Sequence, residues 1–187
     1  MKRYNSIEDF PSDINTIVTI GTFDGIHKGH IAIINRINEI AKKEGLESVV
    51  LTFHPHPRHV IYPDDQELRL INTIEEKTEA LSKTGLQNLV VHKFTKEFSR
   101  TKSINFIRDI LVNKLNMKYM VVGFNHHFGK NREGTFDNLI ELSDVYDFKI
   151  EKVEPQNFAK VTISSTKIRS AIKEGDFKKA NSYLSSN

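Results

Sequence analysis

The sequence predicts an α/β fold, with a doubly wound parallel sheet of five strands in a single domain that spans residues 1–187. Two observations support this prediction. Short apolar runs rich in β-branched residues alternate with segments of helical period, which is the pattern of right-handed β-α-β units. No internal repeat, low-complexity tract or Pro/Ser-rich linker divides the chain, and its length suffices for one ordinary core.

The expected elements follow one another along the whole chain. The expected strands cover residues 16–23, 48–53, 88–94, 118–124 and 149–155. The expected helices cover residues 30–45, 73–85, 103–116 and 135–148, followed by two short helices within 165–184 that are broken at Gly175. Thr73 and Glu76 have the spacing of a capping box at the start of the second helix. Parallel sheets bind ligands outside the carboxyl ends of their strands, so the loops there are where we expect the site.

Composition excludes several classes of function. Because cysteine is absent, disulfides, thiolate nucleophiles and Cys-ligated metal centres are excluded, which fits a cytoplasmic protein. No apolar run approaches the ~20 residues that a membrane span needs, and the basic N-terminus lacks the apolar segment of a secretory signal. The net charge of +3 is compatible with an anionic small ligand, whereas no basic stripe interleaved with aromatics indicates a nucleic acid partner.

The segment GTFDGIHKGH, residues 21–30, lies where the first strand passes into the first helix. Its three glycines allow a tight turn and a close approach of a ligand to the helix start, where free N–H groups favour an anion. His27 and His30 lie on the same side of a helical turn, where each can donate a hydrogen bond to a phosphate and, if partly protonated, add charge. The segment is neither the dinucleotide-binding fingerprint nor a P-loop.

Two other interpretations of this histidine pair stay open. A metal site would need a third ligand, which Asp24, His54 or His56 could supply. An ordinary strand–turn–helix junction would leave the two histidines partly exposed and without a ligand.

The segment FHPHPRHV, residues 53–60, follows the second strand. Pro55 and Pro57 stiffen it, and its histidines with Arg58 make it cationic when they are protonated. Its position at the carboxyl end of a strand indicates a role facing a ligand. The alternative is a rigid surface loop with scattered histidines.

The segment VVGFNHHFGKNREG, residues 121–134, follows the fourth strand. Phe124 and Phe128 are candidates for stacking on a flat ring, and Asn125 offers a donor and an acceptor to the edge of a heterocycle. The alternative for the two aromatic side chains is core packing.

The segment ISSTKIRSAI, residues 163–172, opens the tail helices with three good N-cap residues, Ser164, Ser165 and Thr166. Hydroxyls and N–H groups at a helix start can hold a second anion, and Arg169 lies one turn further on. Taken alone, these residues also fit an ordinary helix cap with a solvated arginine.

Together the four segments resemble the adenylyltransferase domain of the bacterial FAD synthetase family, in the nucleotidylyltransferase superfamily. The shared patterns are G-x-F-D-G-x-H-x-G-H, P-H-P, V-G-x-[ND]-x-x-F-G-x-x-R-x-G and I-S-S-T-x-I-R, and the likeness runs from Ile17 to Leu184. The family often has an aspartate at position 125 and an aromatic residue at position 126, where this chain has Asn125 and His126. Bacterial members commonly continue into a riboflavin kinase domain, which is not expected within residues 1–187.

This resemblance implies a Rossmann-like sheet of the nucleotidylyltransferase type and the reaction FMN + ATP → FAD + pyrophosphate. The implied catalytic residues are His27, His30 and Arg169. The implied ATP-binding residues are Gly21, Thr22, Phe23, Asp24, Gly25, His27, Gly29, His30, Ser164, Ser165, Thr166 and Arg169. The implied flavin-binding residues are Phe53, His54, His56, Pro57, Arg58, Asn125 and Phe128. Mg²⁺ would accompany ATP, with Asp24 as the first candidate ligand, and neither nucleic acid nor membrane would be a partner.

In this scheme His27 and His30 hold the α- and β-phosphates, and Ser164 to Thr166 with Arg169 hold the β- and γ-phosphates. Two alternatives remain: a nucleotidylyltransferase of the same fold that acts on another phosphorylated acceptor, and a regulator that binds flavin or nucleotide without turnover.

Overall fold

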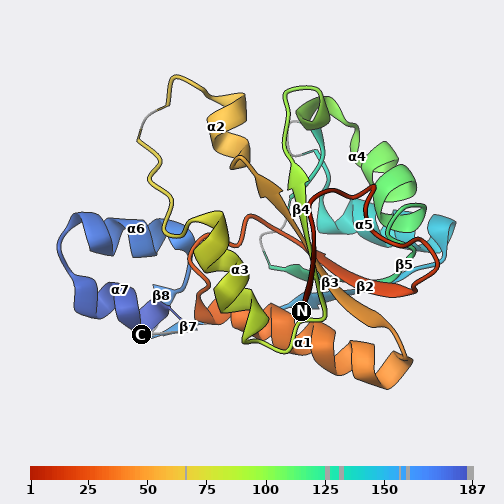
Figure 1. Cartoon of the computed structure of the whole chain (residues 1–187), viewed down its shortest axis with the longest axis horizontal. Coiled ribbons are helices and arrows are strands. Elements are labelled where there is room, and N and C mark those ends of the chain that lie inside the picture. Colours follow the sequence, from red (N-terminus) through yellow and green to blue (C-terminus); the bar gives the residue numbers. More distant parts are fainter. Residues whose placement is uncertain (66, 125–126, 131–132, 156, 159–160, 185–187) are drawn as a thin grey trace.

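A six-stranded parallel sheet lies at the centre of the computed structural model, in the order β1-β4-β3-β2-β5-β6 (Figure 1). Its strands are β1 (Lys2–Tyr4), β2 (Thr16–Ile20), β3 (Glu47–His54), β4 (Asn88–Lys93), β5 (Met117–Gly123) and β6 (Lys149–Val153). A separate antiparallel pair joins β7 (Asn157–Phe158) to β8 (Val161–Thr162). The structure describes residues 1–65, 67–124, 127–130, 133–155, 157–158 and 161–184.

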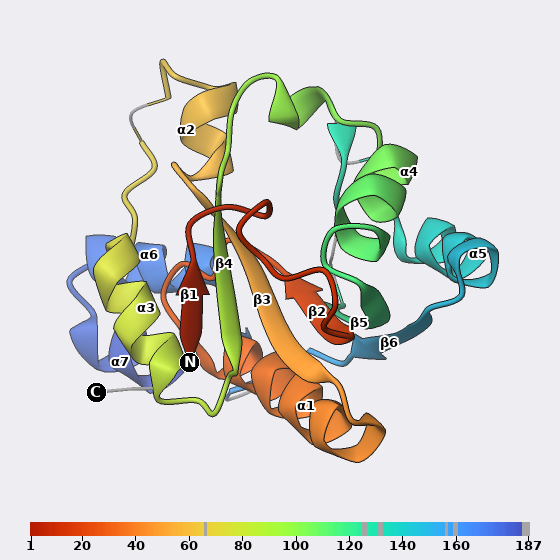
Figure 2. The same cartoon turned by 45° about the vertical axis from the view of Figure 1, so that its right-hand side comes forward.

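Helices cover both faces of the sheet, as expected for a doubly wound fold. The helical elements are α1 (Lys28–Glu44), α2 (Pro57–Ile61), α3 (Ile74–Ser82), the 3₁₀ turn η1 (Phe98–Arg100), α4 (Ser103–Asn105), the π-helical η2 (Phe106–Val112), α5 (Phe136–Tyr146), α6 (Ser165–Lys173) and α7 (Phe177–Tyr183). Alternate residues of β3 serve the two faces: Val50 packs with α1 and α3, whereas Val49 and Leu51 pack with η2 and α5. Figure 2 shows these two helical layers on either side of the strands.

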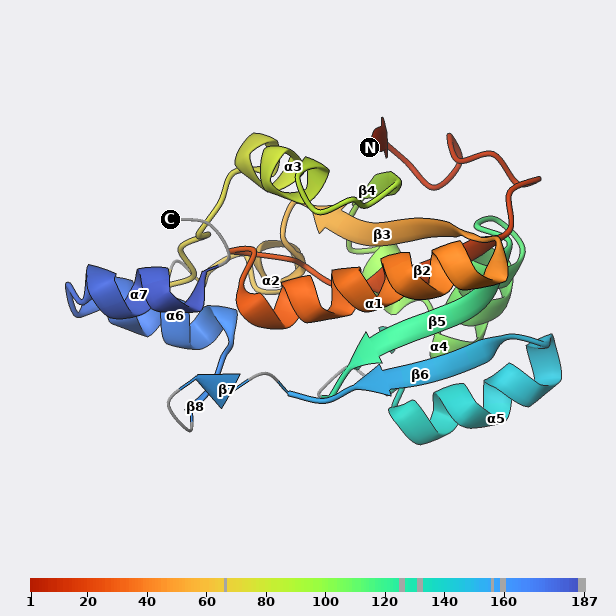
Figure 3. The same ribbon diagram turned by 90° about the horizontal axis from the view of Figure 1, so that it is seen from below.

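The strand order reverses at β2, which pairs with β3 on one side and with β5 on the other. In α/β sheets the crevice outside the carboxyl ends of the strands at this switch point is the usual ligand site. In Figure 3 the arrowheads of β3, β5 and β6 point toward the end of the molecule where α6 and α7 lie. These two helices pack on each other around Ile168 and Ala171, and form a small third core beside that end of the sheet.

The expectation of five strands was wrong, because β1 adds a sixth at the edge. β1 has only three residues, of which Lys2 and Arg3 are exposed, so it shows no apolar period; it is held by backbone pairing with β4. Two further elements differ from expectation. Residues 57–61 form a short helix rather than a loop. Half of the helix expected over 103–116 is π-helical, with i→i+5 bonds such as that from Asn113 N–H to the Arg108 carbonyl.

Candidate active site

The junction between β2 and α1 presents two stacked imidazole rings. His27 is the N-cap of α1, and its Nδ1 accepts a hydrogen bond of 3.2 Å from the backbone N–H of His30. The ring of His30 lies 3.6 Å from that of His27, at an angle of 13°. A Cβ on Gly29 would lie 3.1 Å from the His27 ring, so the glycine leaves room for this stack.

Phe23 supports the stack from the core. Its backbone takes the left-handed conformation (φ 46°), which is unusual for a residue with a side chain. Its ring is buried and lies 4.7 Å from the ring of His30. The side chain of Phe23 therefore positions His30 rather than facing a ligand, and any contact of this residue with ATP would come from its backbone.

The pKa values of the two histidines favour neutral rings at physiological pH, so they would act as hydrogen-bond donors without adding charge. Burial lowers the pKa of His27 to about 4, and burial followed by the positive charge of its neighbours lowers the pKa of His30 well below its usual value. Since Nδ1 of His27 accepts a hydrogen bond, its proton resides on Nε2. Nδ1 of His30 lies 3.5 Å from the backbone nitrogen of His27 and 3.3 Å from the Gly25 carbonyl oxygen. It accepts from the first when its proton is on Nε2, and donates to the second when its proton is on Nδ1.

The pKa of His27 predicts that the protein loses stability as the pH falls from 6.5 to about 4. In this window the unfolded chain binds a proton at residue 27 and the folded chain does not, so the contribution is fully present above pH 6.5 and is lost on acidification. A shift of this size corresponds to about 3 kcal/mol. Urea unfolding at about pH 7.5 and about pH 5 measures the slope.

His27→Asn is the matched variant, since asparagine caps helices well and does not titrate. We expect a shallower loss of stability in this variant than in the wild type. His30, His56 and His92, whose pKa values burial also lowers, add losses of the same sign in both proteins. Equal slopes in the two proteins would contradict the assignment of the low pKa to His27.

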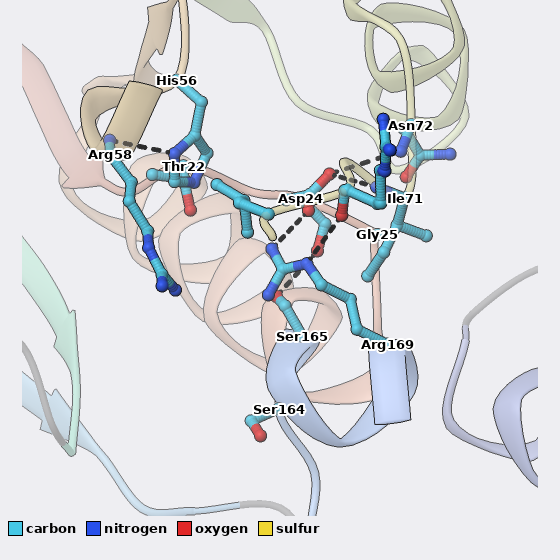
Figure 4. A network of polar contacts seen from close by, with 12 residues as sticks. Thr22, Asp24, Gly25, His56, Arg58, Ile71, Asn72, Ser164, Ser165 and Arg169 are labelled. Atoms are coloured by element: carbon cyan, nitrogen blue, oxygen red, sulfur yellow. Dashed lines mark hydrogen bonds and ion pairs between the residues drawn. The ribbon is translucent and has the colours of Figure 1, made fainter. Parts of the chain in front are cut away.

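Asp24 is the centre of a network that joins three distant segments (Figure 4). Its carboxylate is buried and accepts hydrogen bonds from the backbone N–H groups of Ile71 (2.9 Å) and Asn72 (3.3 Å) and from Nη2 of Arg169 (2.6 Å). Nε of Arg169 donates to the Arg69 carbonyl oxygen (2.9 Å). The structure thus links the β2–α1 loop, the segment before α3 and helix α6 through one carboxylate.

Close packing and a hydroxyl reinforce this junction. Gly25 has a φ of +63°, and a Cβ there would come within 2.8 Å of the Ile71 side chain, so only glycine fits without strain. Ser165 donates from its hydroxyl to the Asp24 carbonyl oxygen (2.7 Å). Ser164 caps α6 by accepting from the Lys167 N–H, and its side chain points away from Asp24 in Figure 4, while Thr166 is exposed.

A cavity of about 360 Å³ lies beside this junction, at the carboxyl end of β3. Phe53, His54 and His56, three of the residues expected to bind flavin, line it together with residues of α3 and of the segment before it. His56 is the N-cap of α2 and accepts from the Arg58 N–H, with Pro57 as the first helical residue. Arg58 itself forms an ion pair with Asp65.

Lys77 also lines this cavity and is not among the site residues predicted from the sequence. It is buried on α3, and its Nζ donates a hydrogen bond of 2.6 Å to the Thr22 carbonyl oxygen. Burial lowers the pKa of its ammonium group, while the negative charge of Asp24 opposes that shift. A signal was present in the sequence: Lys77 shares the inward helical face with Ile74 and Leu81, where an apolar residue is expected.

The aromatic residues after β5 divide between the core and the surface. Phe128 is buried and packs on Phe106, and a Cβ on Gly134 would lie 2.6 Å from its ring. Phe124 is 42 % exposed. The core alternative therefore describes Phe128, and Phe124 is the ring of the two that is open to a partner. Asn125 lies outside the described residues.

The geometry argues against Asp24 as a metal ligand, because both of its carboxylate oxygens already accept hydrogen bonds from the protein. In the described part of the chain no group of three or more His, Asp or Glu side chains could hold a metal ion. The metal interpretation of the histidine pair thus finds no supporting ligand set there.

Among the described helices none is long and apolar enough to cross a membrane.

Comparison with known proteins adds four findings. The family model for FAD synthetase matches residues 9–167. A bifunctional riboflavin kinase/FMN adenylyltransferase from Listeria monocytogenes is 37% identical over 173 residues, which cover 92% of this chain and 54% of that protein. A crystal structure of a macrolide-efflux protein from Streptococcus pneumoniae superposes with a TM-score of 0.85 at 29% identity, covering 99% of this chain and 60% of that one. A pantoate-beta-alanine ligase from Francisella tularensis (TM-score 0.56, 15% identity, 97% and 85% covered) shares the fold.

Proposed function

The chain belongs to the FAD synthetase family, and on that premise we propose that it transfers AMP from ATP to FMN, giving FAD and pyrophosphate. The observation that carries this proposal is the stacked pair of neutral histidines at the start of α1, at the switch point of the sheet. The pair offers N–H donors beside a helix N-terminus, which is the arrangement that binds a polyphosphate. The chain spans about half the length of its relatives, so the kinase activity in their names is not transferred to it.

The reaction requires positioning and charge stabilisation rather than proton transfer. A phosphate oxygen of FMN attacks the α-phosphorus of ATP, forming the new P–O bond of FAD. The bond from the α-phosphorus to the oxygen that bridges to the β-phosphorus breaks, and pyrophosphate leaves with the electron pair. Because the FMN phosphate is already an anion near neutral pH, no general base is needed.

The histidines serve this step as hydrogen-bond donors. The hydrogen bond that Nδ1 of His27 accepts leaves its Nε2–H free to donate. His30 donates from Nε2–H as well when it is in the tautomer whose Nδ1 accepts from the His27 N–H. We assign these donors to the α- and β-phosphates, where negative charge shifts during the reaction. Arg169 and the start of α6 lie across the β2–α1 loop and are assigned to the leaving pyrophosphate.

Mg²⁺ is expected as the companion of ATP, where it neutralises the charge of the triphosphate. The described residues offer no cluster of acidic side chains or histidines for it, so no step is assigned to a protein-held ion. On the acceptor side, the cavity beside β3 is lined by Phe53, His54 and His56 and has the size of a ligand site.

The test is to incubate the purified chain with ATP, Mg²⁺ and FMN and to follow the loss of flavin fluorescence, with chromatography to identify FAD. We expect FAD to form in proportion to enzyme and time. Riboflavin in place of FMN is the control, and we expect neither FMN nor FAD from it. Product formation with another phosphorylated acceptor but not with FMN would replace the acceptor in this proposal. No product with any acceptor, despite binding of nucleotide, would favour a regulator.

A further inference from the structure

We propose that Lys77 is a phosphate-contacting residue, which forms with the cavity beside β3 an anion subsite for the phosphate of the acceptor. This inference rests on the proposed function, in which the acceptor is FMN. The subsite would distinguish a phosphomonoester from the corresponding alcohol, and thus FMN from riboflavin.

The ammonium group of Lys77 is a buried charge whose hydrogen-bonding capacity is not fully used. The side chain of Lys77 is among the buried residues, with 7 % exposed. Its ammonium group carries three N–H donors and makes one hydrogen bond, to the Thr22 carbonyl oxygen, while no salt bridge pairs it with a carboxylate among the described residues. The negative charge of Asp24 offsets part of the cost of burying this cation, and an anion in the adjoining cavity would offset more of it.

The position of the Lys77 charge gives further support. Lys77 contributes to the wall of the cavity, and its charge lowers the pKa of both His30 and His56. Lys77 therefore lies within electrostatic reach of both the phosphate-binding junction and the loop assigned to the flavin. That is where the nucleophilic phosphate must be held if it is to attack the α-phosphorus.

The described groups that neighbour Lys77 at this junction offer no free positive charge to the acceptor. His27 and His30 are neutral, and the charge of Arg169, which is assigned to the leaving pyrophosphate, is already balanced by the carboxylate of Asp24. Lys77 supplies a buried positive charge on the acceptor side of the junction. Asn72, which also lines the cavity, has a buried Oδ1 with no hydrogen-bond partner among the described residues, and a ligand with a hydroxyl group would satisfy it.

A purely structural role would be to fix the β2–α1 loop through the Thr22 carbonyl oxygen. The hydroxyl of Thr52 already donates to the same oxygen (3.2 Å). A structural role therefore predicts that all ligands of the junction weaken together when Lys77 is replaced, whereas an anion subsite predicts loss of the phosphorylated ligand alone.

The experiment uses four proteins: the wild type, Lys77→Met, Lys77→Arg and Lys83→Met. Flavin fluorescence measures the binding of FMN and of riboflavin to each, and calorimetry measures the binding of ATP. Methionine matches the unbranched apolar stem of lysine and lacks its ammonium group. Lys83 is the matched control, an exposed lysine at the end of the same helix. We expect Lys77→Met to weaken FMN binding about 10–100-fold, the scale of a lost hydrogen bond to a charged group, and to leave riboflavin and ATP within about 3-fold. Lys77→Arg should retain part of the preference for FMN, and Lys83→Met should match the wild type.

A second probe separates failure of the subsite from failure of the proposed function. Inorganic phosphate should raise the Tm of the wild type more than that of Lys77→Met. If the wild type binds neither flavin but keeps this Lys77-dependent gain, the acceptor is wrong and the subsite stands. Two results would overturn the subsite. One is that Lys77→Met weakens the binding of FMN and of riboflavin equally. The other is that Lys77→Met binds FMN as tightly as the wild type does and gains as much Tm from phosphate.

Discussion

Replacing His30 by alanine is expected to lower kcat for FAD formation by ~10²–10³-fold, the effect of losing a preorganised donor to a charge that develops in the transition state. The imidazole of His30 is neutral, stacked on His27 and supported by Phe23, so its N–H is held in place before the substrate binds. Steady-state kinetics with saturating FMN and ATP measure the effect.

Loss of folding must be distinguished from loss of the donor. Alanine removes a ring that packs on Phe23, so the Tm and circular dichroism of the variant accompany the kinetics. His30→Gln keeps an N–H donor on a side chain of comparable reach and should recover part of the rate. A folded His30→Ala protein with the wild-type rate would remove His30 from the mechanism.

The second large effect is expected at Asp24. Asp24→Ala should reduce the free energy of unfolding by about 3 kcal/mol, because it leaves the guanidinium of Arg169 and two backbone N–H groups without their shared acceptor. The value is at the low end for a buried pair because the Arg169 side chain is 23 % exposed. FAD formation should fall as well, since the same carboxylate holds α6 against the β2–α1 loop. Urea unfolding and the fluorescence assay measure the two losses.

A double-mutant cycle tests whether the two residues act as a unit. Asp24→Asn and Arg169→Met should together cost less than the sum of the single variants, since each alone strands its partner. Asp109→Ala is the matched control, because the ion pair of Asp109 with Arg108 is about half-exposed on both sides and should contribute little to stability. Additive losses at Asp24 and Arg169 would refute the coupling.

The parts of the fold that were predictable are those with a strong local pattern. The alternation of apolar strands and amphipathic helices predicted the five longer strands of the sheet, and the Thr73–Glu76 spacing predicted the capping box that the structure contains. β1 was not predicted because three residues cannot show a period, and this strand is held by backbone pairing with β4.

The candidate site was predictable only as separate segments. GTFDGIHKGH pointed to a phosphate site, but nothing local shows that Asp24 pairs with Arg169, 145 residues away. The protonation of His27 and His30 depends on burial, which a pattern of residue types does not report. Lys77 lies in a helix that was recognised by its capping box. Its place on the inner face of that helix can be read from the sequence, but the cavity beside it cannot.

The most direct test of adenylyl transfer follows the phosphates of ATP into products. The purified chain is supplied with FMN, Mg²⁺ and ATP that carries a radiolabel either in the α-phosphate or in the γ-phosphate. The proposed reaction places the α-label in FAD and the γ-label in pyrophosphate, at equal rates. Transfer of the γ-label to the flavin, or release of pyrophosphate without α-label in the flavin, would contradict it.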